Sequence, residues 1–596
     1  MAEAATSPFP YQDAHLPVEQ RVDDLLSRMS LEDKAGLLFH AMTFAGDVDE
    51  ASNQMFSWLP PRRLIGEFGL THISVFGSLP DGRAFAQWHN AVQRIAMEHP
   101  LAVPVALATD PRNHFTDNPF TASMAGPFSQ WPEPLGLAAI GSEELVREFA
   151  DIARQEYLAV GLRTALHPQI DLATEPRWTR IPSTFGEDAE LTSRLAVAYI
   201  QGFQTDVLGA ESVATMTKHF PGGGPQKDGT DPHFAWGREQ VYPGDNFDYH
   251  LEPFRAALAA GTAQIMPYYG MPIGTEYEEV GFSYNKSVIT GILREQLGFD
   301  GVVCTDWGLV NDKPGNSELG RAKAWGVEHL SEDDRLVKLV DAGVDQLGGE
   351  YCSDRLVRLV KAGRITEARI DESARRLLRQ KFVLGLFERP FVDEDRAEVV
   401  LGNPAFRDAG RRAQQRALTL LTNEASAVGA PTLPLSRGVK VYAEGFGDDA
   451  LAGYATVVES PADADVAILR LSSPWEPRGE GMAANFRGGS LEYQPEELLR
   501  VTEICEAAPT VLDIAMHRPP VLGTLVDAAA AIIANYGIAE PLLLEVLFGD
   551  AAPEGNLPFD LPSSMAAVLD SRTDVPFDTA DPAFRFGHGL RYAAGR

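Results

Sequence analysis

The chain has 596 residues, of which 44% are hydrophobic and 23% are charged, a composition typical of a folded protein with two or more domains. Its 84 acidic residues outnumber the 51 basic ones and give a net charge of −33, which argues against nucleic acid or an anionic membrane as partner. The three cysteines, Cys304, Cys352 and Cys505, are too few and too widely spaced for a disulfide framework or a zinc motif.

The start of the chain carries no sign of export. Residues 1–20 are polar and lack the basic start and apolar core of a signal peptide. No later apolar run is long enough to cross a bilayer. From the sequence as given we therefore expect a cytoplasmic protein.

Strand-like and helix-like segments alternate after an amphipathic helix pair at residues 16–39, whose second helix Ser30 and Asp33 can cap. Such alternation indicates a parallel sheet, and the number of units favours a closed (β/α)8-type barrel over residues 1–388. The expected strands are residues 72–76, 102–109, 164–170, 213–217, 264–267, 301–305 and 344–347, and the expected helices include 143–160, 191–205, 248–260 and 331–341.

Polar and aromatic side chains follow these expected strands at the point where each one ends. Because the carboxyl ends of parallel strands meet on one face of a barrel, this pattern predicts an active site on that face. The residues concerned are Asp110, Asp171, Lys218, His219, Tyr268, Tyr269 and Asp306.

A second, smaller domain follows a linker at residues 389–404. We expect an open α/β sandwich over residues 405–596, which begins with a helix at 406–422. The tail from residue 556 is irregular and long enough to pack back on the barrel. The expected strands of this domain are residues 439–443, 465–471, 510–515 and 530–534, with a helix at 495–507.

The stretch at residues 298–308 contains the strongest single candidate for chemistry. A short buried strand ends on the carboxylate of Asp306, which Trp307 follows directly. A carboxylate at this place indicates catalysis, because its burial has to be compensated by pairing or by function. The other interpretation is that Asp306 caps the next helix.

A second motif, Lys218-His219-Phe220-Pro221-Gly222, also follows an expected strand. The glycines after it permit an irregular backbone, on which Lys218 and His219 could both bind one polar ligand. A phosphate-binding loop is the alternative, but the spacing fits neither the Walker nor the dinucleotide pattern. Sugar hydroxyls suit these donors when acidic acceptors and aromatic rings lie nearby.

These motifs resemble those of glycoside hydrolase family 3, which contains β-glucosidases, β-xylosidases and exo-glucan hydrolases. The resemblance extends from the entry helix at residues 22–29 to the tail at 584–590, and its most specific parts are 218–222 and 298–307. It implies a barrel followed by an α/β domain, with the sugar pocket between them. It also implies that Asp306 is the nucleophile that forms a covalent glycosyl-enzyme.

The resemblance assigns further residues to sugar binding. Trp307 would form part of an aromatic wall. In two places the chain departs from the family pattern: Ser183 stands where many members have glutamate, and the loop after Asp110 is altered. Both departures leave open which sugar is bound. The residues expected to hold the terminal sugar are Asp110, Arg180, Lys218, His219 and Tyr269, with Trp475 beside the acid/base loop.

The acid/base is harder to place. Many members take it from a Gly-Glu pair after a strand of the second domain, but this chain has Ser472 and Ser473 there. We expect Glu476, on the same loop and beside Trp475, to act as acid/base, with Glu480 as the second choice. A further alternative is the Asp231-Pro232-His233 sequence, because one branch of the family uses an Asp-x-His dyad as acid/base.

The sequence thus predicts a retaining, exo-acting β-glycosidase that removes a terminal sugar, most simply β-D-glucose, from oligosaccharides or glycosides. The carboxyl pair needs no metal or organic cofactor. We expect a small carbohydrate or glycoside as substrate, no nucleic-acid or membrane partner, and a monomer or homodimer. The alternatives are a β-xylosidase, an N-acetyl-β-glucosaminidase that uses His233 and Asp231, a transglycosylase, or a carbohydrate-binding homologue with impaired catalysis.

Overall fold

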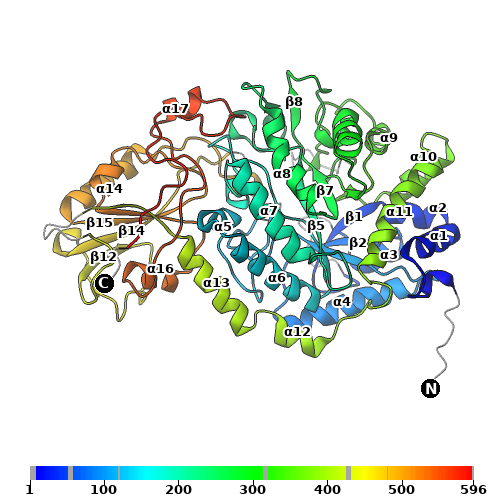
Figure 1. Cartoon of the computed structure of the whole chain (residues 1–596), viewed down its shortest axis with the longest axis horizontal. Coiled ribbons are helices and arrows are strands. Elements are labelled where there is room, and N and C mark those ends of the chain that lie inside the picture. Colours follow the sequence, from blue (N-terminus) through cyan, green and yellow to red (C-terminus); the bar gives the residue numbers. More distant parts are fainter. Residues whose placement is uncertain are drawn as a thin grey trace.

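The computed structural model describes residues 9–50, 58–118, 121–312, 320–424, 431–478 and 481–592. They form two α/β domains that lie beside each other along the long axis of the molecule (Figure 1). Helices α1 and α2 lie at the far end of the first domain, and the last described residues lie beside the second sheet, where Leu590 bridges Leu420.

Eight strands form the sheet of the first domain, in the order β10-β1-β2-β3-β4-β5-β7-β9, and every pair in it is parallel. A bridge between Cys304 and Gln346 joins the two ends of this order, with Thr305 N donating to Gln346 O at 2.9 Å. The sheet is therefore a closed, TIM-like barrel, as predicted. Its strands are β1 (Phe39–Phe44), β2 (His72–Phe76), β3 (Ala106–Thr109), β4 (Leu162–Ala165), β5 (Ala214–Phe220), β7 (Gln264–Pro267), β9 (Val302–Val303) and β10 (Leu347–Gly348).

Helices cover the outside of the barrel (Figure 1). Ser30 begins α2 with a capping box, in which its side chain accepts from Asp33 N and the carboxylate of Asp33 accepts from Ser30 N, as the sequence predicted. In the described part of the chain no helix has the length and apolar character needed to cross a membrane. The barrel helices are α1 (Val18–Arg28), α2 (Leu31–Leu37), α3 (Pro61–Gly66), α4 (Gly82–Met97), α5 (Pro134–Ile140), α6 (Glu143–Ala159), α7 (Ala189–Gln204), α8 (Phe247–Ala259), the π-helix Ser287–Gln296, α9 (Glu332–Ala342), α10 (Ser353–Lys361) and α11 (Glu367–Val383).

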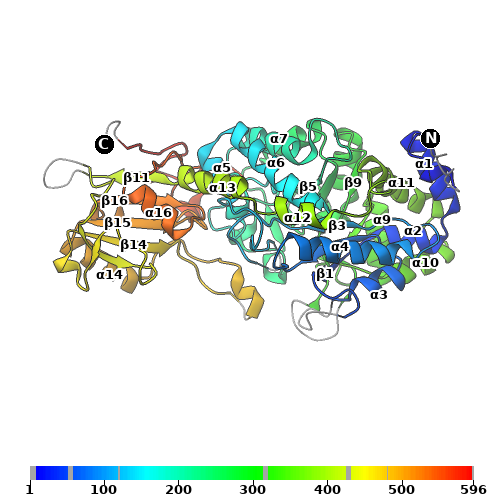
Figure 2. The same cartoon turned by 90° about the horizontal axis from the view of Figure 1, so that it is seen from below.

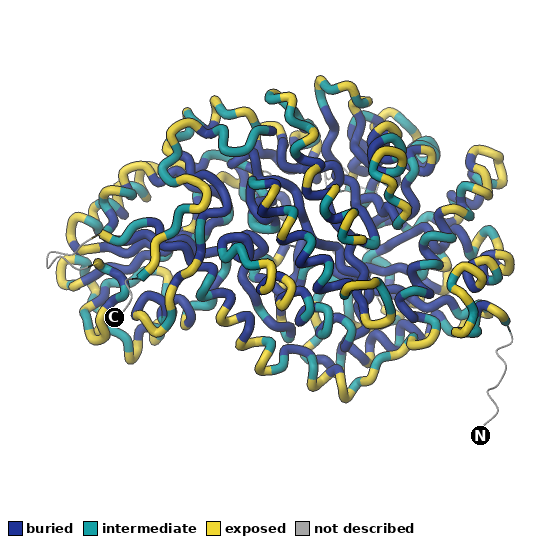
Figure 3. Tube along the Cα trace, viewed as in Figure 1, coloured by how far each residue is buried: buried dark blue, intermediate teal, exposed yellow. Residues whose placement is uncertain are grey.

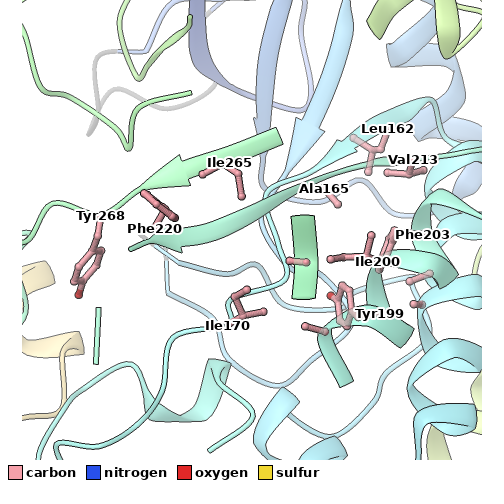
Figure 4. Packing of buried hydrophobic residues seen from close by; sticks show 14 of the residues in the cluster. Leu162, Ala165, Ile170, Tyr199, Ile200, Phe203, Val213, Phe220, Ile265 and Tyr268 are labelled. Atoms are coloured by element: carbon pink, nitrogen blue, oxygen red, sulfur yellow. The ribbon is translucent and has the colours of Figure 1, made fainter. Parts of the chain in front are cut away.

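The core has two layers. Inside the barrel, small and flexible side chains such as Ala108, Met216 and Cys304 fill the space below Trp307. Outside it, rings and aliphatic chains of α7, among them Tyr199 and Phe203, pack against the strands (Figure 4). The buried residues lie along the strands and on the inner sides of the helices (Figure 3). This packing fixes the strand ends, and hence the residues that follow them.

The second domain is a six-stranded mixed sheet in the order β11-β16-β15-β14-β12-β13, in which only β11 runs antiparallel to its neighbour. The segment predicted as a linker contains the short helix α12 (Glu394–Val400), which packs on α4. The other elements are α13 (Pro404–Ala417), β11 (Thr419–Asn423), β12 (Lys440–Glu444), β13 (Thr456–Val457), β14 (Val466–Ser472), α14 (Pro495–Ala507), β15 (Thr510–Ala515), α15 (Leu525–Ala528), β16 (Ala531–Asn535), α16 (Glu540–Leu547) and α17 (Met565–Asp570).

The tail that follows the second sheet returns to the barrel. Asp574 accepts hydrogen bonds from Gly244 N at 2.7 Å and Asn246 N at 2.9 Å. Glu187, just before α7, accepts from Asp560 N and Phe577 N of the tail. The two domains are thus connected by the tail as well as by the segment around α12. A two-stranded ribbon of β6 (Glu239–Val241) and β8 (Met271–Ile273) lies beside this contact.

Candidate active site

Asp306 lies three residues after β9, at the carboxyl end of the barrel, and is 8% exposed. Its Oδ1 accepts from Trp307 N at 2.8 Å, and its Oδ2 lies 3.8 Å from His219 Nε2. Residues 307–312 are not helical, so Asp306 caps no helix there. Of the two interpretations of Asp306, the geometry favours the one in which its carboxylate faces a polar cluster.

That cluster begins with the two residues at the end of β5. Lys218 Nζ lies 3.0 Å from Asp110 Oδ1, which places a residue after β3 beside one from β5. His219 Nδ1 lies 2.8 Å from Asp171 Oδ2, and its ring turns Nε2 toward Asp306. The sequence therefore placed four polar side chains correctly at one face of the barrel.

Asp171 fixes the protonation of this histidine. Burial lowers the pKa of His219, although the facing carboxylate of Asp171 raises it, and the net effect is a ring that stays neutral. Burial would raise the pKa of Asp171, but the charge and hydrogen bond of His219 and the bond from Gly223 N lower it. The neutral His219 ring carries its proton on Nδ1 and donates it to Asp171. Its Nε2 is therefore free of a proton and can accept a hydrogen bond from a sugar hydroxyl.

Arg180 comes from the long segment after β4. It is 5% exposed and donates from Nη2 to Gln169 Oε1 at 2.8 Å. Burial would raise the pKa of Asp231, but His233 and, to a smaller extent, the charge of the nearby Arg180 lower it. Arg180 therefore is not a surface arginine but part of the buried polar cluster on this face.

Of the two adjacent tyrosines, Tyr269 contacts the segment that carries the nucleophile candidate. Its hydroxyl donates to Trp307 O at 2.7 Å and accepts from Trp307 N at 2.8 Å. Burial, followed by the charge of Asp306, raises the pKa of Tyr269 well above its ordinary value, so the hydroxyl remains a neutral donor. Tyr268 instead is completely buried and packs its ring 4.8 Å from that of His219. Trp307 packs over the barrel interior, 5.2 Å from the ring of His40.

The loop after β14 reaches from the second domain toward the barrel (Figure 2). Glu476 is exposed, and Trp475, also exposed, lies beneath the guanidinium of Arg487 at 6.0 Å. The expectation that Trp475 desolvates Glu476 is therefore wrong in this structure, because neither side chain is enclosed. Ser473, where many members have glutamate, is buried and accepts from Arg518 N. Glu480 lies outside the described residues.

The alternative dyad lies within the cluster. His233 Nδ1 is 2.6 Å from Asp231 Oδ1, and the imidazole packs 4.8 Å from the ring of Tyr269. Phe486 of the second-domain loop covers the other side at 5.2 Å. Burial would raise the pKa of Asp231, but the charge and hydrogen bonds of His233 lower it. The dyad is thus built from the barrel and covered by the second domain.

Sequence reasoning missed the partners that hold these groups. Two of these partners were not singled out: Gln169, which accepts a hydrogen bond from Arg180, and Arg518, which follows β15 and donates to Ser473. Each follows a strand, and that signal could have found them. None of the described side chains forms a group of three or more histidine, cysteine or carboxylate ligands for a metal ion.

The comparisons with known proteins place the chain. Residues 62–380 match the glycosyl hydrolase family 3 N-terminal domain, and residues 415–592 match the glycosyl hydrolase family 3 C-terminal domain. The chain belongs to glycoside hydrolase family 3. It is therefore a retaining glycoside hydrolase, and the predicted fold and enzyme class are confirmed.

Several curated relatives match over nearly the full chain. The beta-glucosidase C of Emericella nidulans is 50% identical over 588 residues, which are 98% of this chain and 94% of the relative. A probable beta-glucosidase C of Aspergillus oryzae is 50% identical over 98% of this chain and 91% of its own length. A periplasmic beta-glucosidase/beta-xylosidase of Dickeya chrysanthemi is 40% identical, with 98% and 91% covered.

Solved structures share the fold. A β-glucosidase from Erythrobacter marinus superposes with a TM-score of 0.77 at 22% identity, covering 98% of this chain and 84% of that one. A β-glucosidase from Listeria innocua in complex with glucose gives a TM-score of 0.73 at 21% identity, with 96% and 83% covered.

Proposed function

We propose that this family 3 hydrolase removes terminal β-D-glucose from oligosaccharides or glycosides with retention of configuration. The observation that carries the proposal is the position of Asp306, whose carboxylate lies 3.8 Å from a neutral His219 at the carboxyl end of the barrel. The names of the relatives that are 50% identical support glucose as the sugar.

The reaction follows from a carboxylate pair. Asp306 Oδ attacks the anomeric carbon as the bond to the leaving oxygen breaks, and Glu476 donates the proton that this oxygen takes up. Glu476 then removes a proton from water, whose oxygen displaces Asp306 and releases the sugar. Lys218, Asp110 and Arg180 would hold the hydroxyls of the sugar during both steps.

A panel of aryl glycosides tests the choice of sugar. We expect the highest kcat/KM for the β-glucoside and release of β-glucose as the first product by proton NMR. The Dickeya relative makes the β-xyloside the second candidate substrate. A larger kcat/KM for the xyloside or the N-acetylglucosaminide than for the glucoside would contradict glucose as the sugar.

The buried His233–Asp231 pair is a specific reason to test a second acid/base. Glu476→Ala should lose kcat/KM for phenyl β-glucoside by roughly 10²-fold or more but keep it for the dinitrophenyl glucoside, whose leaving group needs no proton. Azide should speed this variant and yield glucosyl azide. If His233→Ala shows this behaviour and Glu476→Ala does not, the dyad is the acid/base.

A further inference from the structure

Arg518, three residues after β15, is a completely buried arginine at the boundary between the two domains, 1% exposed. Its guanidinium donates to four backbone carbonyl oxygens rather than forming a simple ion pair. Nη1 donates to Arg177 O at 3.1 Å and Gly489 O at 2.9 Å, and Nη2 donates to Pro474 O at 2.5 Å and Ser490 O at 3.1 Å.

These four carbonyls have a clear arrangement. Three of them lie at the two ends of the loop that carries Glu476: Pro474 at its start, and Gly489 and Ser490 at its end. The Arg518 guanidinium joins both ends, and Glu476 N donates to Gly488 O at 2.9 Å across the same base. The loop is therefore closed at its root by one side chain.

The remaining carbonyl belongs to the barrel. Arg177 lies in the segment between β4 and α7 that also carries Asp171 and Arg180, and its own side chain is held by Glu175 at 2.8 Å. The loop makes a second contact with the barrel, where the ring of Phe486 packs on that of Phe234 at 5.2 Å. One arginine thus links the root of the acid/base loop to the barrel segment that supplies sugar-binding residues.

Arginine suits this place because its planar fork can serve several acceptors in fixed directions. Burial lowers the pKa of Arg518 to about 10, which still leaves the side chain charged at neutral pH. A buried charge that is used only to hold carbonyls needs a strong reason to be kept, since apolar packing could join two domains at lower cost.

We propose that Arg518 is a positioning residue, which fixes the loop between Pro474 and Ser490 against the barrel so that Glu476 can reach the leaving oxygen. This inference rests on the proposed function, in which Glu476 is the acid/base. Arg518 touches no substrate and acts only through the loop. Loss of the fork should therefore impair proton donation specifically and leave attack by Asp306 intact.

A series of aryl β-glucosides with leaving phenols of decreasing acidity separates the two steps. For Arg518→Met we expect kcat/KM to fall by roughly 10- to 100-fold for phenyl β-glucoside, which needs a proton, and less than about threefold for the dinitrophenyl glucoside. Arg518→Lys keeps the charge but not the fork, and should show the same selective loss. If Arg518→Met does not fold, the Arg518→Lys variant alone tests the proposal.

The controls separate this inference from the proposed function. Arg500→Met removes an arginine of the same domain that pairs with Glu444 on the surface, and should leave both substrates unchanged. In the double variant with Glu476→Ala, Arg518→Met should add no further loss for the phenyl glucoside, because both act through one group.

Equal losses for both substrates, no loss in either variant, or additive losses in the double variant would each overturn the role of Arg518. If Glu476→Ala alone shows no selective loss, the acid/base assignment itself is wrong and the inference falls with it. A selective loss in Glu476→Ala that both Arg518 variants lack contradicts only the positioning role.

Discussion

The carboxylates at the carboxyl end of the barrel differ in what faces them. Asp110 is paired with Lys218, and Asp171 and Asp231 are each bonded to an imidazole. Asp306 instead meets the Nε2 side of His219 at 3.8 Å, beyond hydrogen-bond distance. Of these four carboxylates, Asp306 is therefore the one that no lysine or imidazole holds within hydrogen-bond distance.

Asp171 should matter for catalysis although it is placed to contact His219 rather than the sugar. The Asp171 carboxylate can only accept a hydrogen bond and so keeps the His219 proton on Nδ1. The amide of Asp171→Asn can also donate, so the tautomer of His219 is no longer fixed and Nε2 is no longer always an acceptor. We expect kcat/KM for the β-glucoside to fall by roughly 10- to 100-fold, with an unchanged circular dichroism spectrum.

The exposed Asp206 on the same domain provides the matched control, since its carboxylate is 83% exposed. Asp206→Asn should retain full activity. Activity of Asp171→Asn equal to that of the wild type would show that His219 needs no partner.

At the scale of single residues, the sequence predicted which side chains lie at the site better than it predicted the groups to which they bond. Lys218, His219 and Asp306 could be found because each follows a strand, and strand ends meet on one face. Gln169 and Arg518 also come after strands, but their roles could not be predicted, because the groups that they bond are brought together only by the fold. These groups are the Arg180 guanidinium for Gln169 and backbone carbonyls for Arg518. The exposure of Glu476 also depends on the loop conformation, which no local pattern specifies.

At the scale of elements, most barrel strands lie within a few residues of their predicted positions, because apolar runs between helical patterns are a strong signal. The first strand, β1, was missed, since His40 and Thr43 interrupt its apolar run. The helix predicted at 406–422 instead ends at Ala417, and the rest is strand β11, because pairing with β16 decides the conformation of Thr419–Asn423.

Glu133, which precedes α5, should make stability depend on pH. Its Oε1 accepts from Phe115 N, Thr116 N and Thr116 Oγ1, and burial raises its pKa from 4.5 to about 7. A raised pKa in the folded state favours the protonated form, so its contribution is present below about pH 4.5 and is lost as the pH rises through about 7.

Glu133→Gln keeps the accepting oxygen and cannot ionise. Between about pH 5 and pH 8 we expect the free energy of unfolding of the wild type to fall relative to this variant, by up to about 3 kcal/mol. Denaturant titrations at several pH values measure it. Glu252→Gln, at an exposed position on α8, should follow the wild type, and parallel curves for Glu133→Gln would contradict the argument.

At the scale of the whole molecule, the site is assembled from both domains, and their arrangement depends on contacts far from the chemistry. The tail carries one of these contacts, because Asp574 is completely buried and binds two backbone amides of the segment before α8. The sequence indicated that the tail was long enough to return to the barrel but not which residue would hold it.

Asp574→Ala leaves the amides of Gly244 and Asn246 without their acceptors. We expect a loss of stability of roughly 1–3 kcal/mol, because both amides are part-buried and a fully buried unpaired amide costs about 1–3 kcal/mol. Thermal or denaturant unfolding measures it, with the exposed Asp570→Ala as the control. A variant as stable as the control would show that the tail contact does not stabilise the barrel.

Trapping of the covalent intermediate tests the assignment of Asp306 most directly. A deoxyfluoroglucosyl fluoride should inactivate the enzyme, and mass spectrometry of the digested protein should find one added fluoroglucosyl group on the peptide that contains Asp306. Asp306→Asn should take up no label and lose turnover by roughly 10³-fold or more. A label on another carboxylate, or undiminished turnover in Asp306→Asn, would contradict the account.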